Sequence, residues 1–200
     1  MSQAQPAPVL IPTLGALELS SVARGLVVCD AMLKKANVRL LRATPLASGK
    51  FLVLLTGAEA DLEEAVQEGQ GLSDPHLVGW TCIPNIHPQV VDALRRRTVA
   101  EVPLDAVGIL EATSLVSALR ASDLAVKAAG VRLLELTFHL DMGGKAFFTV
   151  TGDLSEVTAA LEAGAAQLRA DGAFVNQEII ARPHGDLGAL LRDRQENPCF

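Results

Sequence analysis

The sequence predicts an α/β (α+β) protein made of two tandem ferredoxin-like domains, each with the element order β-α-β-β-α-β. Three observations lead to this prediction. The stretch that begins at Gly15 is repeated in the stretch that begins at Gly108. Each copy alternates apolar runs of strand length with segments of helical periodicity. A polar segment that contains Pro103, "RRRTVAEVPLDA", separates the two copies.

The internal repeat is visible position by position. At an offset of 93, about 12 of 27 positions are identical between "GALELSSVARGLVVCDAMLKKANVRLL" and "GILEATSLVSALRASDLAVKAAGVRLL". The offset becomes 95 after the next loop, where Thr56 meets Thr151, and 97 where His87 meets His184. Because three segments keep one order with small insertions between them, we interpret the chain as a duplicated domain of about 90 residues.

Local signals support each element of the repeat. Two serines, a residue type favoured at the helix N-cap, open the first helical segment, and a Gly-containing loop joins two strand-length runs as in a hairpin. Acidic residues begin the second helix and a glycine ends it, and Pro88 stands in the first turn of a last helix. The first repeat is therefore expected to contain strands at 14–20, 38–44, 50–57 and 77–84 and helices at 20–36, 58–69 and 87–97.

The domain boundaries follow from the repeat. We expect a flexible N-terminal segment at 1–13, a first domain at 14–100, a second domain at 105–194 and a C-terminal tail at 195–200. The chain has 200 residues, of which 50% are hydrophobic and 20% charged, which is enough for a packed core in each domain.

Composition also excludes several classes of function. The net charge is −6 and the one basic cluster, Arg95 to Arg97, is short, so nucleic-acid binding is not expected. No apolar run approaches the roughly 20 residues that span a bilayer, and the N-terminus lacks the features of a signal peptide. Three widely spaced cysteines, Cys29, Cys82 and Cys199, indicate a reducing cytosol.

The ordered set of motifs resembles the shell proteins of bacterial microcompartments. The motifs are "DAMLKKANV" and "DLAVKAAGV", the "SGK" and "GGK" loops, the "A…EAG" helices, and "IPNIHP" and "IARPH". The resemblance runs from Gly15 to Leu191 and is greatest to the tandem-domain, trimer-forming class of the propanediol-utilisation type, with non-permuted domains. It implies two tandem microcompartment shell domains in a protein of the bacterial cytoplasm.

The family resemblance further implies a pseudohexameric homotrimer that tiles shell facets around a central pore for small metabolites. It implies that the edge lysines of the family correspond to Lys34 and Lys127 and its edge arginine to Arg182, whereas Asn85 stands at the matching position of the first repeat. Other shell proteins, both hexamers and pentamers, and encapsulated enzymes are the implied partners.

The two hairpin loops differ in length and chemistry, and in the family these loops surround the pore. The first loop is small and neutral, and the second carries a carboxylate and a histidine. Some relatives hold an iron–sulfur cluster on a loop cysteine, but the first loop here has none, so no cofactor is expected. The residues expected to line the pore are Leu46, Ala47, Ser48, Gly49, Leu140, Asp141, Met142 and Gly143.

Other polar residues are interpreted as structural. His87 and His184 have no Cys or acidic cluster nearby that would complete a metal site, and a hydrogen-bonding role is favoured. Asp30 and Asp123 are paired by the repeat without a companion nucleophile, so no catalytic site is predicted. The alternatives to a shell tile are an electron-transfer shell protein with an iron–sulfur cluster, a tandem ligand-binding or regulatory protein, and an enzyme.

Overall fold

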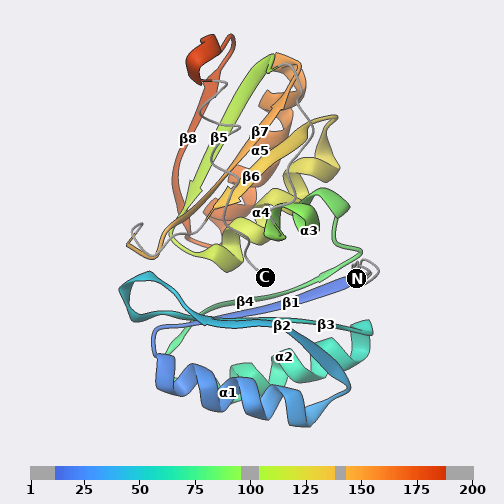
Figure 1. Ribbon diagram of the computed structural model, residues 1–200, viewed down its shortest axis with the longest axis vertical. Helices are drawn as coiled ribbons and strands as arrows, with labels where there is room; N and C mark the ends of the chain where they lie inside the picture. Colours follow the sequence, from blue (N-terminus) through green and yellow to red (C-terminus); the bar gives the residue numbers. More distant parts are fainter. Residues whose placement is uncertain (1–11, 96–103, 138–142, 188–200) are drawn as a thin grey trace, which may run out of the picture.

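The computed structural model describes residues 12–95, 104–137 and 143–187, and it confirms the predicted fold class. The chain forms two α+β units in sequence order (Figure 1). The first unit contains β1 (Thr13–Leu19), α1 (Val22–Lys35), β2 (Val38–Pro45), a 3-10 turn at Ala47–Gly49, β3 (Phe51–Gly57), α2 (Glu59–Ser73), β4 (Leu77–Pro84) and α3 (Pro88–Leu94). The second contains β5 (Ala106–Ala112), α4 (Leu115–Ala128), β6 (Arg132–Thr137), β7 (Ala146–Gly152), α5 (Leu154–Ala170) and β8 (Phe174–Ile180).

Both sheets have the same topology. Their strand orders are β2-β3-β1-β4 and β6-β7-β5-β8, and every pairing is antiparallel. The hairpin register shifts between Leu40 and Arg42 in the first repeat and between Leu133 and Glu135 in the second. The duplication therefore extends to an irregularity of the ladder, as expected for copies of one ancestral domain.

Local chemistry explains the helix starts. Ser21 and Ser114 are the N-caps of α1 and α4, and each hydroxyl accepts a hydrogen bond from the backbone N–H three residues later. The prediction that the second helix ends at Gly69 is wrong, because α2 continues to Ser73. A Cβ at Gly69 would lie 2.8 Å from the sulfur of Met32, so this glycine lets α2 approach α1 closely and does not end the helix.

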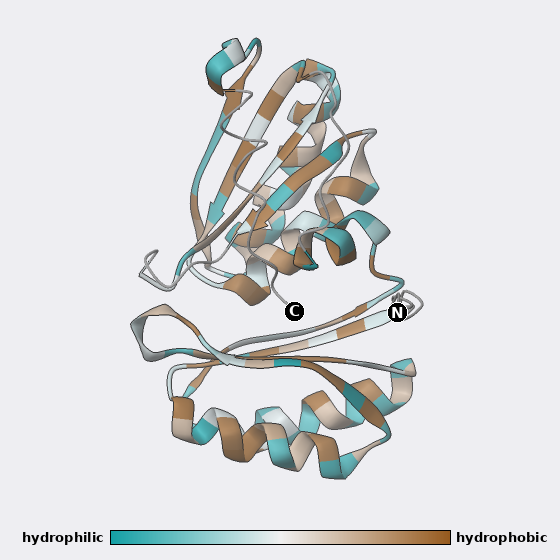
Figure 2. Ribbon diagram, in the orientation of Figure 1, coloured by the Kyte–Doolittle hydropathy of each residue, from teal (hydrophilic) through white to brown (hydrophobic). Residues whose placement is uncertain are grey.

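The core has two parts. Between the first sheet and the pair α1 and α2, Leu17, Met32 and Phe51 belong to a cluster within the first repeat. The larger cluster joins both repeats, because Leu14 and Leu54 on the opposite face of the first sheet pack with residues of the second repeat. Because both faces of the first sheet are covered, β1 and β3 are buried along nearly their whole length. Figure 2 shows hydrophobic residues on both the strands and the helices. No helix in the described part of the chain is long and apolar enough to cross a membrane.

Candidate functional site

The main candidate site is a surface between the two repeats. Helix α4 of the second repeat lies over the open face of the first sheet, and α4 and strand β6 pack against α3 (Figure 1). We call this contact the interior interface. It is apolar at its centre, where Leu115 and Leu119 of α4 are buried in the same cluster as Ala16 and Leu52 of the first sheet.

A buried ion pair stands at the N-terminal end of α4. The Glu18 carboxylate is fully buried and lies 2.9 Å from the Lys50 ammonium. It also accepts hydrogen bonds from the Ser114 hydroxyl at 2.8 Å and the Val116 N–H at 3.2 Å. The first turn of a helix favours an anion because its N–H groups are free to donate. Glu18 therefore anchors the second repeat on the first.

Lys50 connects the two hairpin loops. Its ammonium donates to the backbone carbonyls of Thr113 and Gly144, each at 2.9 Å, in addition to pairing with Glu18. Gly144 follows the second hairpin loop and Lys50 follows the first, so the ends of the two loops lie side by side. With these partners the cation is well satisfied although its side chain is mostly buried.

Side chains from each repeat also bind free backbone at the edges of the sheets. Arg120 of α4 donates to the Trp80 carbonyl at 3.0 Å and to the Thr81 hydroxyl at 3.2 Å, both on edge strand β4, and pairs with Asp171 at 3.0 Å. The Gln89 amide of α3 donates to the Val131 carbonyl at 3.2 Å and accepts from the β6 residue Leu133 at 2.7 Å. Edge strands β4 and β6 are thus each protected by the other repeat.

The matching face of the first repeat is uncovered. At the repeat offset of 93, Leu119 corresponds to Leu26 and Arg120 to Val27. Leu119 is 0% exposed, whereas Leu26 and Val27 are 57% and 58% exposed. Other residues of α1 and one of β2 are likewise exposed, whereas their counterparts in the second repeat are less exposed. We call the exposed set the outer stripe: Ala23, Leu26, Val27, Asp30, Leu33 and Leu40.

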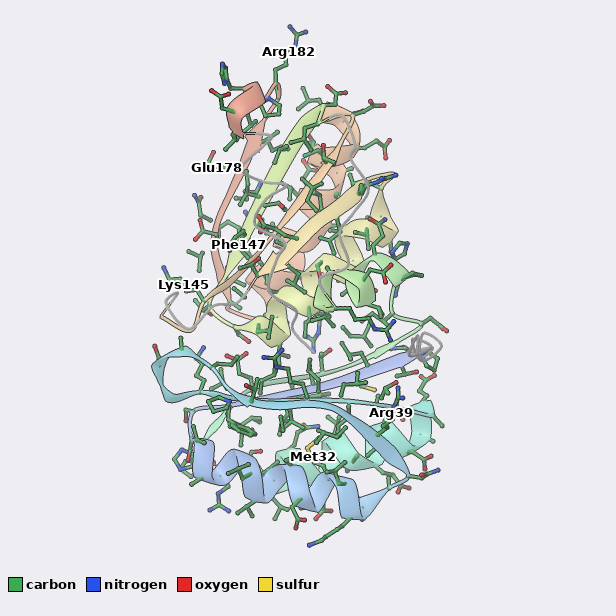
Figure 3. All side chains as sticks on the ribbon, in the orientation of Figure 1. Met32, Arg39, Lys145, Phe147, Glu178 and Arg182 are labelled. Atoms are coloured by element: carbon green, nitrogen blue, oxygen red, sulfur yellow. The ribbon has the colours of Figure 1, made fainter. Side chains whose placement is uncertain are left out.

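In the interior interface the first sheet receives α4. The second repeat carries an equivalent sheet surface, on which no helix of the described chain lies. Glu111 and Lys145 stand where Glu18 and Lys50 stand in the first repeat, but here Lys145 is exposed. Phe147 corresponds to the buried Leu52, and Glu178 to the buried Thr81. Lys145, Phe147 and Glu178 lie along one side of the second repeat (Figure 3). We call this side the second receiving face.

The residues predicted to line a pore are placed in part. Ala47 is buried and Leu46 packs against the core, whereas Ser48 and Gly49 are exposed. Ser48 adopts a left-handed backbone with φ of 59°, which turns the loop sharply. Gly143 is exposed, and the remaining predicted residues, Leu140, Asp141 and Met142, lie outside the described residues. The loop Pro45–Gly49 contains no Cys, so it cannot supply thiolate ligands to an iron–sulfur cluster.

The residues predicted at a tile edge are found on the surface. Lys34 pairs with Asp30 at 2.5 Å, and both side chains are mostly exposed. Lys127 pairs with Asp123 at 2.5 Å, and Asp123 also accepts from the His87 N–H at 2.7 Å. Arg182 projects from the end of the molecule distant from the first repeat (Figure 3). The structural interpretation of both aspartates as polar contacts is consistent with these hydrogen bonds.

The histidines make local hydrogen bonds. His87 is the N-cap of α3, and its Nδ1 accepts from the Gln89 N–H at 3.3 Å. His184 makes the equivalent bond with Asp186 at 3.3 Å. Among the described residues, no group of three His, Cys, Asp or Glu side chains could hold a metal ion.

The two described thiols belong to the first repeat. Burial raises the pKa of the Cys29 thiol, with a smaller contribution from Asp30. Burial, followed by the charges of Glu63 and Glu59, raises the pKa of the Cys82 thiol to about 11. Both thiols are therefore protonated near neutral pH and are poor nucleophiles.

Sequence reasoning did not identify the polar contacts of the interior interface. Glu18, Lys50 and Gln89 each have a counterpart at the matching position of the second repeat. These counterparts indicate positions with a shared role, but they do not indicate which copy is buried. Arg120 gives a clearer signal, because an apolar residue, Val27, occupies the matching position. Differences between repeats mark the places where their surroundings differ.

Comparison with known proteins gives consistent matches across the chain. The BMC domain model matches residues 13–86 and again residues 106–183. The chain is 37% identical to the bacterial microcompartment shell protein PduT of Citrobacter freundii over 171 residues, which cover 86% of this chain and 92% of that protein. It is 40% identical to the shell protein EutM of Escherichia coli K12 over 84 residues, 42% of this chain and 84% of that protein.

A solved structure extends the likeness to three dimensions. The crystal structure of a microcompartment protein from Desulfitobacterium hafniense DCB is similar with a TM-score of 0.77 and 34% identity, covering 90% of this chain and 99% of that one. A fused permuted hexameric shell protein is similar with a TM-score of 0.59 at 18% identity, covering 79% of this chain and 81% of that one, which shows a shared fold.

Proposed function

Because the chain belongs to the BMC domain family and carries that domain twice, we propose that three copies close into a ring of six domains. The protein is a shell protein of a bacterial microcompartment, and its tandem domains form a pseudohexamer. The homotrimer, its pore and its edges are the finer parts of the proposal.

The observation that carries the trimer is the difference in burial between α4 and α1. The outer stripe repeats the residues with which α4 covers the first sheet, and it has no cover within the chain. The second receiving face repeats the surface that α4 covers. A second copy of the chain can therefore dock its α1 on the second receiving face in the manner of the interior interface.

Such a contact is heterologous, since it joins two different surfaces. Heterologous contacts form either a closed ring or an open filament, depending on the rotation between neighbours. If the contact between chains has the same rotation as the interior interface, six domains close a ring and three chains complete it. Apolar side chains as exposed as Leu26 and Val27 then become buried, which supplies the driving force for assembly.

The pore is proposed at the centre of this ring. Lys50 holds the ends of the two hairpin loops together, which supports placing both loops at one axis. Ser48, Gly49 and Gly143 bring small polar groups, and Asp141 brings a carboxylate. Three copies of Asp141 around one axis favour cations and neutral polar metabolites and oppose anions.

A charge change at Asp141 tests the pore. We expect Asp141→Lys trimers in planar bilayers or reconstituted shells to gain anion permeability, and Asp141→Asn to fall between it and the wild type. Trimers of unchanged mass are the control. An ion preference that is identical in wild type and Asp141→Lys would place the loop away from the pore.

The tile edges are proposed at Lys34, Lys127 and Arg182. Lys34 and Arg182 lie on the surface without a place in the interior interface, and Asn85 replaces the arginine in the first repeat. The two kinds of edge are then chemically different. Replacing Lys34 and Arg182 by Ala leaves the trimer intact and weakens the lateral assembly of discs.

The partners follow from the role. Hexameric and pentameric shell proteins complete the facets and vertices, and encapsulated enzymes lie on the inner side, within the bacterial cytoplasm. We propose no enzymatic activity, since Glu18, Lys50 and Arg120 of the interior interface are each held in a hydrogen bond that joins the repeats.

The oligomer and the sheet are tested together. Sedimentation should give three times the 21.0 kDa mass of one chain, and negative-stain imaging should show discs that tile into sheets. Sheets with normal order from the Lys34 and Arg182 variants would remove the edge assignment. A monomer at micromolar concentration would remove the proposed trimer.

A further inference from the structure

The interior interface and the proposed contact between chains differ in the position of one cation on the docking helix. In the interior interface the cation is Arg120, and its counterpart in the outer stripe is Val27. One turn earlier on the helix the order is reversed, because Ser117 of α4 corresponds to Arg24 of α1. Arg24 is exposed, and its guanidinium has no ion pair with a described residue.

The strand that receives the helix changes in a complementary way. Gly79 and Thr81 of β4 face α4, and at the offset of 97 they correspond to Asn176 and Glu178 of β8. Both β8 side chains are exposed, and the Asn176 amide donates to the Glu178 carboxylate at 3.4 Å. A small, neutral strand surface is thus replaced by one that carries an anion.

The interior interface gives the placement of these residues. A Cβ on Gly79 would lie 3.6 Å from the Ser114 hydroxyl, and the Thr81 hydroxyl lies 3.2 Å from Nε of Arg120. Strand β4 from 79 to 81 therefore runs beside α4 from 114 to 120, and Ser117 lies between these two contacts.

If α1 of one chain lies on β8 of a second chain as α4 lies on β4, Arg24 takes the place of Ser117. Arg24 then lies beside the segment from Asn176 to Glu178. The Val27 side chain is apolar and cannot satisfy the Glu178 carboxylate. The long Arg24 side chain, one turn away on the same helix, is the cation within reach.

We propose that Arg24 of one copy forms an ion pair with Glu178 of a second copy, and that this pair selects the strand on which α1 docks. The inference rests on the proposed trimer. Strand β4 offers Gly79 and Thr81 to an approaching helix, so it gives Arg24 no carboxylate. Strand β8 offers Glu178, held by Asn176. The pair therefore favours contact between the first repeat of one chain and the second repeat of another.

Charge reversal tests the pair. Arg24→Glu and Glu178→Arg each place like charges at all three contacts of the ring, so each should raise the concentration at half-dissociation by at least about tenfold. The double variant Arg24→Glu/Glu178→Arg should restore the wild-type mass in sedimentation. Because both side chains are exposed, the thermal unfolding of dilute monomers should not change.

A matched control separates this pair from general charge effects. Arg39→Glu makes the same change in charge as Arg24→Glu on an exposed side chain of the same repeat (Figure 3). Its counterpart Arg132 stays exposed beside the interior interface, so Arg39→Glu should leave the trimer unchanged.

Mixing the two single variants gives a second test. Opposite charges meet only between unlike variants, and a closed ring of three cannot alternate two kinds of chain. We therefore expect mixtures to form dimers across matched contacts but few stable trimers, unlike the double variant.

The outcomes distinguish the two levels of the proposal. A monomeric wild type would overturn the trimer itself. A trimeric wild type together with trimeric single variants, or a double variant that fails to recover, would overturn the ion pair and leave the trimer standing.

Discussion

Helices α1 and α4 are copies of one helix in different surroundings. Each begins at a serine N-cap, carries an aspartate that pairs with a lysine four residues later, and ends before an extended strand. Yet α4 is buried on two sides and α1 on one. The difference teaches that the repeat encodes a helix with two apolar faces, and that the second face is buried where another domain lies against it, as on α4.

The largest effect should come from placing a charge at equivalent positions of the two helices. Leu119→Asp buries an unpaired carboxylate in the joint core and should destabilise the monomer by more than about 4 kcal/mol. Leu26→Asp should change monomer unfolding by at most about 0.5 kcal/mol while abolishing the trimer. Chemical denaturation of dilute protein and sedimentation measure the two effects. Equal loss of fold in both variants would contradict the comparison.

Lys50 and its counterpart Lys145 should show the same contrast between monomer stability and trimer stability, with a smaller change in free energy. Lys50→Ala leaves the Glu18 carboxylate buried without a cation, which should cost about 3 kcal/mol of unfolding free energy in the single chain. Lys145→Ala removes an exposed cation, so we expect monomer unfolding to stay within about 0.5 kcal/mol and the trimer to weaken. If Lys145→Ala lowered monomer stability as much as Lys50→Ala, the two positions would not be equivalent.

A side-chain exchange should strengthen one contact and weaken the other. Gln89 both donates to and accepts from the β6 edge, whereas Asp186 at the matching position can only accept. Asp186→Gln should add one hydrogen bond between chains, worth about 1 kcal/mol, and lower the dissociation constant severalfold. Gln89→Asp should remove one bond from the interior interface and cost the monomer about as much. A trimer weakened by Asp186→Gln would be the contrary result.

The smallest effect concerns Cys82, whose counterpart in the second repeat is Ile179. Burial raises the pKa of the Cys82 thiol from 9.0 to about 11, so the fold favours the protonated thiol. Its contribution to stability is present below pH 9.0 and is lost as the pH rises through about 11. In a Cys199→Ser background, alkylation at Cys82 should be slow near neutral pH and accelerate toward that value. Alkylation as fast as that of the unfolded chain near neutral pH would contradict this.

Elements defined by local chemistry could be predicted from the sequence. Strand β4 at Leu77–Pro84 matches its predicted range, and the serine cap of α1 and Pro88 mark two helix starts. The end of α2 could not be predicted, because a glycine that stops a helix and one that lets two helices approach look alike in sequence. Gly69 is of the second kind.

The candidate site was predictable only in outline. The repeat and the family resemblance indicated a ring with loops at its centre, but not which copy of Glu18 and Glu111 is buried. That depends on the order in which the chain joins its domains, which is a property of the tertiary structure. The placement of Asp141 and its neighbours stays a prediction, since they lie outside the described residues.

The interior interface also changes how assembly depends on concentration. Contacts such as Glu18 with Ser114 and Lys50 with Gly144 join the two repeats within one chain, where the covalent connection supplies an effective concentration far above that of free subunits. In the proposed trimer, half of the contacts of the ring are made before chains meet. The yield of these proposed discs would rise with the third power of free chain concentration, where six separate domains would require the sixth. A scarce tandem protein can therefore complete its discs at cellular levels at which single domains would remain dispersed.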